Sequence, residues 1–225
     1  MKAAAAAVGG FVACLVAGST ALAFAGGGVK SVTVDAARLF PMLGAYFNLP
    51  ESDRSGFQLI YRFRLQGSDQ PPPIKLFYLR GSDQTPVTVN AEGWIEQLPT
   101  REDIKARTRM LMQGPEGLKV MEDINVISTL PPRPQYAAAE LSAGLDQVNR
   151  SAHRAAGLMS FVVPHFSKAI FVGAGSGTAV TPDGHAIPLP MSKDGPAFDP
   201  ARLANARAIW LTHPPARVVY GTDKD

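Results

Sequence analysis

Phe57-Gln58-Leu59-Ile60-Tyr61-Arg62-Phe63-Arg64-Leu65 is the stretch that decides the fold class. Apolar residues occupy its odd-numbered positions, and polar residues occupy the even ones except Ile60. This period of two predicts a β-strand with one buried and one wet face. A sheet with one solvated face is usually antiparallel, so we expect antiparallel sheets. Arg62 and Arg64 fall on the wet face, where they form either a solvated strand surface or a patch that contacts an anion.

Other short strands are expected on both sides of this one. In the first half they cover residues 74–79, 87–89, 110–112 and 120–127, and turn residues separate them. Short, closely spaced strands without intervening helices indicate sandwich-like or barrel-like sheets. Residues 137–156 follow a proline-rich break and carry strong helix formers with leucine and valine at helical spacing, which predicts one long helix. The expected fold class is therefore α+β and β-rich, with antiparallel sandwich-like sheets.

Two segments of the chain resemble each other without a gap. Residues 90–99 read NAEGWIEQLP and residues 181–190 read TPDGHAIPLP, so an acidic residue, a glycine and a Leu-Pro pair recur at equal distances. Thr100 is expected to cap a short helix after the first copy, and Asp199-Pro200 to start one after the second. This order favours two related β units joined by a helix, an internal repeat. The alternative is that acidic-glycine turns and Leu-Pro pairs recur by chance.

The predicted domain organisation has five parts. They are residues 1–25, a cleaved signal peptide; 26–56, an N-terminal strand and helix segment; 57–130, the first β unit; 131–165, a proline linker and connecting helix; and 166–225, the second β unit.

The leader is predicted from its composition. Lys2 is its only charge, an apolar run of small residues follows, and Ala23-Phe24-Ala25 has the small-x-small pattern of a cleavage site. A retained membrane anchor and a lipoprotein modified at Cys14 are the competing interpretations. Cleavage would place the mature protein in the periplasm or outside the cell, with no stable membrane span.

The mature chain would contain no cysteine, because Cys14 is the single one in the sequence. Disulfides, thiol catalysis and cysteine metal sites are thereby excluded from it. The net charge is +3 and falls to +2 when Lys2 is removed, and lysine and arginine form no run, so we expect no nucleic-acid partner. We predict no cofactor.

No catalytic or metal-binding residues are assigned, and the binding residues are unknown. The four histidines have no metal-ligand spacing. Ser176, Asp183 and His185 lie close enough in sequence to suggest a triad, although a triad must converge in space. Glu102-Asp103 and Glu122-Asp123 are adjacent pairs, whose side chains point different ways on a helix or strand.

The function predicted from these observations is that of a non-catalytic envelope protein, a binding or structural module with an unknown envelope protein or ligand as partner. The alternative is a cofactor-independent periplasmic or secreted hydrolase that uses Ser176, Asp183 and His185. A third hypothesis, a membrane-tethered assembly factor, requires the leader to be retained.

Overall fold

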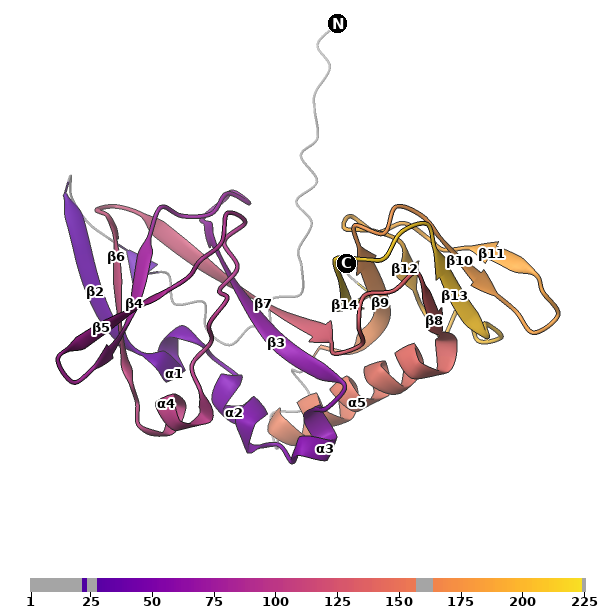
Figure 1. The fold of residues 1–225 in the computed structure, drawn as a ribbon, viewed down its shortest axis with the longest axis horizontal. Coiled ribbons are helices and arrows are strands. Elements are labelled where there is room, and N and C mark those ends of the chain that lie inside the picture. The colour runs from indigo at the N-terminus through magenta and orange to yellow at the C-terminus, as the bar shows by residue number, and fades with distance from the viewer. Residues whose placement is uncertain (1–21, 24–27, 157–163, 224–225) are drawn as a thin grey trace, which may run out of the picture.

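Three antiparallel sheets and five helices make up the computed structural model over the described residues, which are 22–23, 28–156 and 164–223. A central sheet lies between two smaller four-stranded sheets, one at each end of an elongated molecule (Figure 1). The strands of the central sheet are β3 (Phe57–Leu65), β7 (Lys119–Ser128), β14 (Arg217–Thr222), β9 (Phe166–Val172) and β12 (Ala197–Phe198), with β1 (Leu22–Ala23) beside β7. The predicted β-rich α+β class is confirmed.

Each smaller sheet belongs to one half of the chain. The N-terminal one is ordered β2 (Val29–Asp35), β6 (Arg109–Pro115), β4 (Lys75–Arg80), β5 (Asp83–Val87). The C-terminal one is ordered β8 (Gln135–Ala137), β13 (Ala208–Leu211), β10 (Gly177–Val180), β11 (Ala186–Pro188). The helices are α1 (Ala36–Leu39), α2 (Leu43–Asn48), α3 (Glu51–Arg54), α4 (Arg101–Lys105) and α5 (Ala138–Ala156).

The pattern of strand pairing in one half recurs in the other. β6 lies between β2 and β4 as β13 lies between β8 and β10, and the outer hairpins β4–β5 and β10–β11 extend both sheets. The register is also the same in the two sheets. In the N-terminal sheet Arg109 of β6 lies between Asp35 and Leu79, and in the C-terminal sheet Ala208 of β13 lies between Ala137 and Val180.

The connections to the helices and the central sheet recur too. The N–H of Ala36 bonds the carbonyl of Thr108, and the N–H of Ala138 bonds the carbonyl of Arg207, so α1 and α5 leave the sheets in the same way. β3 pairs with β7 as β9 pairs with β14, and β7 meets β14 antiparallel, the arrangement that a two-fold axis through the sheet produces.

This repeated pairing does not follow the alignment that the Leu-Pro pairs suggest. Leu189 follows β11, and its N–H bonds the carbonyl of Gly177. In the N-terminal sheet the equivalent place belongs to Val87, which ends β5 opposite Leu76. Leu98, the residue that the Leu-Pro alignment pairs with Leu189, lies eleven residues beyond Val87. The residue alignment of 90–99 with 181–190 is therefore wrong. A common origin of the two halves stays a prediction, as do the domain boundaries. Because β2 pairs with β6 along its length, residues 29–35 complete the N-terminal sheet.

Turn and helix physics explains how the short segments fold. Residues 36–48 form two helices because Pro41 interrupts the helical hydrogen bonds and Met42 adopts φ 68°. The third strand begins at Asp83 rather than 87, because Gly81 at φ 62° allows a tight turn. Residues after Asp199 form turns and no helix: the N–H of Leu203 bonds the carbonyl of Asp199, but the N–H of Ala206 bonds Leu203, three residues back. Thr100 does form a capping box with Asp103.

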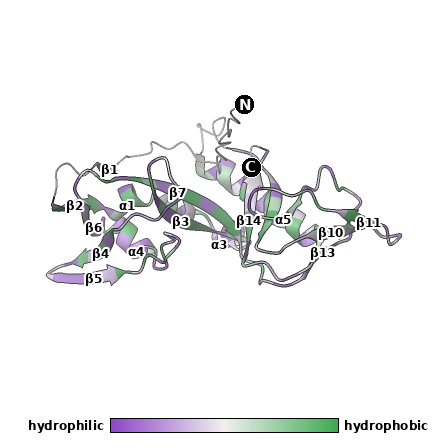
Figure 2. Cartoon of the chain, turned by 90° about the horizontal axis from the view of Figure 1, so that it is seen from above, coloured by the Kyte–Doolittle hydropathy of each residue, from purple (hydrophilic) through white to green (hydrophobic). Residues whose placement is uncertain are grey.

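The hydrophobic core is continuous through the central sheet. Figure 2 shows hydrophobic residues along β14 and β7, and Ile124, Val126, Val218 and Tyr220 are buried there. α5 packs against β9, β8 and β13. This core holds the small C-terminal sheet in place, so that one of its faces is covered and the other is solvated.

The leader lies almost wholly outside the described residues. Leu22 and Ala23 are described, and they pair with Val120 and Lys119 of β7. No helix in the described part of the chain is long and apolar enough to cross a bilayer. The predicted cleavage after Ala25 concerns residues outside the described ranges.

Candidate functional site

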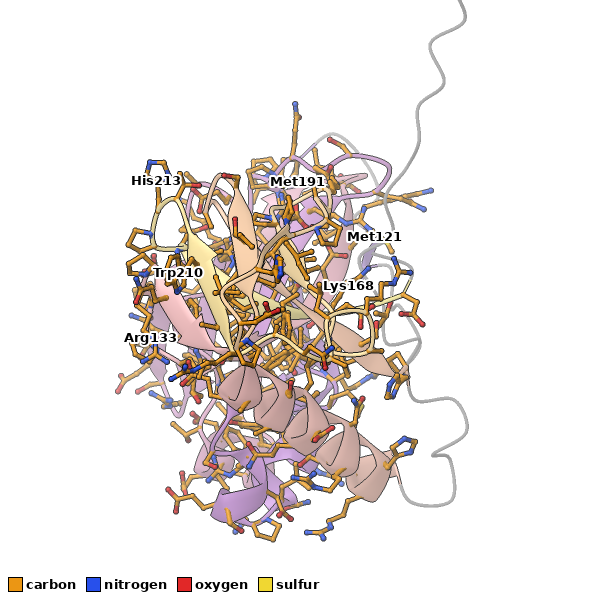
Figure 3. The ribbon with its side chains drawn as sticks, turned by 90° about the vertical axis from the view of Figure 1, so that its right-hand side faces the viewer. Met121, Arg133, Lys168, Met191, Trp210 and His213 are labelled. Carbon is orange, nitrogen blue, oxygen red and sulfur yellow. The ribbon has the colours of Figure 1, made fainter. Side chains whose placement is uncertain are left out.

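The outer face of the C-terminal sheet carries the most exposed tryptophan of the described chain. Trp210 of β13 is 52% exposed, whereas its neighbours Ile209 and Leu211 are 0% and 8% exposed. Successive strand residues point to opposite faces, so Ile209 and Leu211 fill the core while Trp210 points to solvent. Figure 3 places Trp210 on the outer side of this sheet, with Arg133 toward α5 and His213 toward the opposite end.

Two rows of residues across the four strands define this surface, which we name the Trp210 face. Strand register places them side by side as Gln135–Trp210–Thr178–Pro188 and Ala137–Ala208–Val180–Ala186. None of the eight side chains is ionisable, and those beside the indole are small or uncharged. The Trp210 face is therefore a flat, neutral sheet surface from which one large aromatic ring stands out.

Polar groups border the Trp210 face at one end. Ser176 and Thr212 join their hydroxyl groups at 2.9 Å, and the backbone N–H of Thr212 bonds the carbonyl of Ser176 at 3.0 Å. Arg133 pairs with Glu140 and lies 5.0 Å from the ring centre of Tyr136. The guanidinium of Arg133 is thus paired with a carboxylate, and the Trp210 face itself contains no charged side chain.

Proline blunts the outer edges of both small sheets. Pro188 lies in edge strand β11 opposite Thr178, and Pro86 lies in edge strand β5 opposite Phe77. Proline has no N–H to donate, and edge prolines hinder the addition of a foreign strand. Recognition at the C-terminal sheet is therefore better suited to its face than to the β11 edge.

The three residues of the hydrolase hypothesis are not brought together. Ser176 precedes β10, whereas Asp183 and His185 lie in the hairpin beyond it, and four strand residues at about 3.3 Å each separate the two ends by roughly 13 Å. The Asp183 carboxylate does lie 3.5 Å from His185 Nε2, but both side chains are largely exposed. Ser176 has Thr212 and not His185 as its hydroxyl partner.

The two arginines of β3 already have protein partners. Arg62 donates to the carbonyls of Glu92 at 2.8 Å and Asp69 at 2.6 Å, and Arg64 pairs with Asp123 at 2.8 Å. These bonds favour the structural interpretation of Arg62 and Arg64 over an anion-contacting patch.

Trp94 belongs to the contact between the two halves. It lies 5.7 Å from the guanidinium of Arg62 in β3 and 4.4 Å from that of Arg217 in β14, measured to the ring centre. Lys193 and Asp69 add an ion pair between the halves at 3.5 Å. Cation–π contacts of this kind stabilise by about 0.5–2 kcal/mol. Trp94 therefore has a structural role, which leaves Trp210 as the tryptophan available to a ligand.

The adjacent carboxylate pairs diverge, as expected. Asp103 caps α4 and accepts bonds from Arg80; burial alone would raise its pKa, but the bonds from Arg80 and Thr100 hold that pKa below its usual value. Glu122 lies on the inner side of β7, where burial and then the charge of Asp123 raise its pKa to about 9. Its Oε1 atom is buried without a hydrogen-bond partner.

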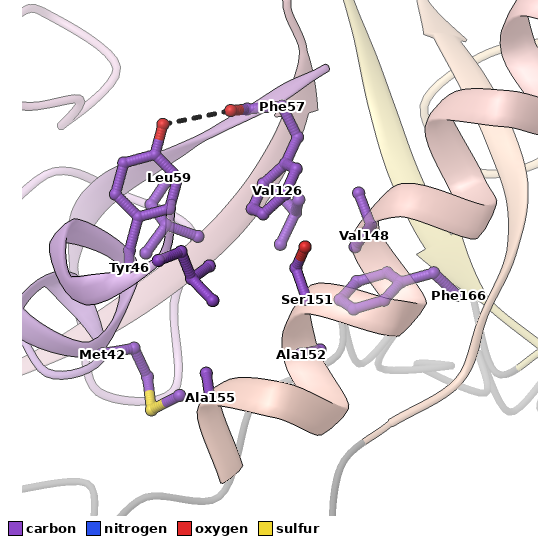
Figure 4. A pocket seen from close by; sticks show the side chains of 11 residues that line it. Met42, Tyr46, Phe57, Leu59, Val126, Val148, Ser151, Ala152, Ala155 and Phe166 are labelled. Atoms are coloured by element: carbon purple, nitrogen blue, oxygen red, sulfur yellow. Dashed lines mark hydrogen bonds between the residues drawn. The ribbon is translucent and has the colours of Figure 1, made fainter. Parts of the chain in front are cut away.

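An apolar pocket lies between α2, β3 and α5 (Figure 4). It has a volume of about 50 Å³, and the hydroxyl of Tyr46 on its wall donates to the carbonyl of Phe57 at 3.1 Å. Pockets that hold small-molecule ligands usually measure about 300–1,000 Å³. This pocket is therefore a packing gap between the halves and not a ligand site.

No group of three or more histidine, cysteine or acidic side chains that could hold a metal ion occurs within residues 22–23, 28–156 and 164–223. Sequence reasoning did not single out Trp210. The signal was present, because a tryptophan between Ile209 and Leu211 in a strand with one buried face must point outward.

The chain matches no protein-family model, no curated protein and no solved structure. Its function is therefore argued from the geometry of its own surfaces.

Proposed function

We propose that this is an exported, non-catalytic protein of the cell envelope that works as a binding module through the Trp210 face. The observation that carries the proposal is a 52% exposed tryptophan at the centre of a neutral sheet face, in a fold whose other tryptophan is held between its two halves. Tryptophan is enriched among the residues that dominate binding energy. Leaving so large an apolar side chain in water contributes nothing to folding, so its use lies in recognition.

Export is supported by the leader sequence. A single lysine, an apolar run of small residues and Ala23-Phe24-Ala25 are the features that signal peptidase recognises. The single cysteine of the chain lies within this leader, so the mature protein needs no redox protection outside the cytoplasm.

The hydrolase alternative receives less support from the geometry. A nucleophile needs its base within hydrogen-bond reach, and Ser176 and His185 lie at opposite ends of β10. The side chains of His185 and Asp183 are 81% and 67% exposed, so the pair lies open to solvent and not in an enclosed cleft.

The test combines location with binding. The full chain is produced in a Gram-negative host, and the mass of the purified protein is measured; a chain that begins at Gly26 in the periplasm or medium is expected. The protein is then sedimented with purified envelope fragments. We expect Trp210→Ala to remain in the supernatant while wild type sediments.

The matched control is Val29→Ala, which removes an apolar side chain that is 82% exposed and lies in the other small sheet. This variant should sediment as wild type does. Cytoplasmic protein with an intact leader would contradict the export proposal, and equal sedimentation of wild type and Trp210→Ala would contradict the binding role of the Trp210 face.

A further inference from the structure

We infer that the ligand of the Trp210 face is a neutral saccharide, whose ring stacks on the indole of Trp210. The inference rests on the proposed binding function and adds the chemical class of the ligand. It follows from three properties of the surface: its small area, its lack of charge and the arrangement of hydrogen-bonding groups around the indole.

The area of the Trp210 face is too small for a stable protein partner or a second copy of this chain. Four strands about 4.8 Å apart span roughly 14 Å, and the two rows lie about 7 Å apart along the strands. With margins for the side chains, this is on the order of 200 Å², whereas stable protein interfaces bury about 800 Å² on each partner. The Trp210 face instead has the dimensions of one or two sugar rings.

Strand addition by a peptide is also disfavoured on this side of the molecule. The neighbouring edge strand β11 has only three residues, and Pro188 removes one of its few donors. An extended peptide depends on main-chain hydrogen bonds to a free edge. A ligand that uses ring stacking and side-chain hydrogen bonds has no such requirement.

The chemistry of the surface suits a neutral sugar. The face of an indole is electron-rich, and the C–H groups on one side of a pyranose ring carry the complementary partial charge. Gln135 and Thr178 lie on either side of Trp210 and offer amide and hydroxyl groups to the hydroxyls at the rim of that ring. No ionisable side chain occurs in the two rows, so a phosphate or an acidic sugar would find no counter-charge there.

The sequence itself provides a clean fluorescence assay, because the chain contains two tryptophans. In Trp94→Phe protein, Trp210 is the sole tryptophan reporter, and the phenyl ring keeps an aromatic surface for Arg62 and Arg217. This protein is titrated with soluble hexamers of glucose, of N-acetylglucosamine and of galacturonate. We expect a saturable blue shift of the emission with at least one of the two neutral hexamers, and no comparable response to the charged one.

Calorimetric titration of the otherwise wild-type chain then assigns the site. Trp210→Ala should weaken binding of the neutral hexamer at least tenfold, and Trp210→Phe should weaken it less because a ring remains. Gln135→Ala should also weaken it. Circular dichroism confirms that each variant is folded, which is expected because Trp210 and Gln135 lie on the solvated face.

The inference is overturned if neither neutral hexamer changes the emission at millimolar concentration, or if Trp210→Ala binds as wild type does. It is equally overturned if the chain dimerises in analytical ultracentrifugation and Trp210→Ala abolishes the dimer, since a second copy would then occupy the face. Envelope sedimentation that depends on Trp210 without binding of either hexamer would refute the saccharide and leave the proposed function standing.

Discussion

Glu122 should make the protein less stable as the pH rises, and Glu122→Gln should remove this effect. In the folded state burial, followed by the charge of Asp123, raises the pKa of Glu122 from 4.5 to about 9. Between these two values the folded chain binds one proton more than the unfolded chain. The contribution of the neutral carboxyl is therefore complete below pH 4.5 and is lost as the pH rises through 9, at about 1.4 kcal/mol per pH unit.

A rise of the pKa from 4.5 to about 9 corresponds to at most about 6 kcal/mol, and we expect about 3 kcal/mol because the side chain keeps some contact with water. Neighbouring groups do not cancel it. Asp123 is paired with Arg64 on the other side of the strand. Tyr61 lies two residues along β3 from Phe63, the residue opposite Glu122, and it stays neutral because burial and the Glu122 charge raise the pKa of its phenol. The glutamine variant keeps the shape of the side chain and has no proton to lose.

The assay is urea unfolding of wild type and Glu122→Gln at pH 5, 7 and 9. We expect similar free energies of unfolding at pH 5, and a more stable glutamine variant at pH 9 by about 3 kcal/mol. Glu96→Gln, at an exposed glutamate, is the control and should follow wild type at each pH. Parallel pH profiles for wild type and Glu122→Gln would refute the reasoning.

Four further substitutions test the turns and the capping box by urea unfolding. Gly93→Ala should lower the free energy of unfolding by about 2 kcal/mol or more, because φ is 87° and the new Cβ would meet the carbonyl oxygen of Phe63 at 2.2 Å. Gly67→Ala is the control, with φ 77° and open space around it, and should lower the free energy of unfolding by only about 1 kcal/mol. Equal losses in the two variants would contradict the steric argument. Thr100→Ala should cost about 1 kcal/mol by removing the N-cap, and no loss would show that the box is dispensable. The pKa of Asp103 is lowered in the folded state, so its carboxylate stabilises the fold above the unfolded pKa of 3.8, and this stabilisation is lost as the pH falls. Asp103→Asn should therefore be less stable than wild type at pH 7 and should lose less stability between pH 7 and pH 2. An equally steep loss in the two proteins would argue against this role of Asp103.

The elements that sequence reasoning predicted well are those that one local pattern determines. Phe57–Leu65 alternates strictly on one face and forms β3 with the same bounds, and the helix predicted at 137–156 is observed as α5 from Ala138. Both segments are long and strongly periodic, so local pattern and tertiary packing agree. The segment after Asp199 shows the opposite case. It has a capping residue and a proline at the first position, yet it forms turns, in which the N–H of Ala206 bonds Leu203 three residues back.

The candidate surface could have been found only in part. That Trp210 points outward follows from the burial of Ile209 and Leu211 on either side. Its neighbours could not be predicted, because Gln135 and Thr178 come from β8 and β10, and strand pairing over such distances is not a local property. The neutral character of the surface is therefore a result of topology.

The two halves fill equivalent core positions with different side chains, so the pairing pattern that they share leaves little trace in the sequence. In the N-terminal sheet Met110 of β6 lies between Val34 and Tyr78; in the C-terminal sheet its equivalent, Ile209, lies between Tyr136 and Ala179. The large aromatic residue lies in β4 in one half and in β8 in the other. Equivalent positions thus carry different side chains, so a residue-by-residue alignment of 90–99 with 181–190 had little chance of locating the correct register.

The same comparison separates folding from function on the outer faces. The position of Trp210 is taken in the N-terminal sheet by Leu111, which is partly buried and lies beside Phe77, the equivalent of Thr178. The N-terminal sheet therefore forms with this register without an exposed tryptophan, so the register itself does not require one. The two halves share one pairing pattern, but at this position only the C-terminal half exposes a large apolar side chain to water. Folding does not explain the exposure of Trp210, and binding is the role to which such a side chain is best suited.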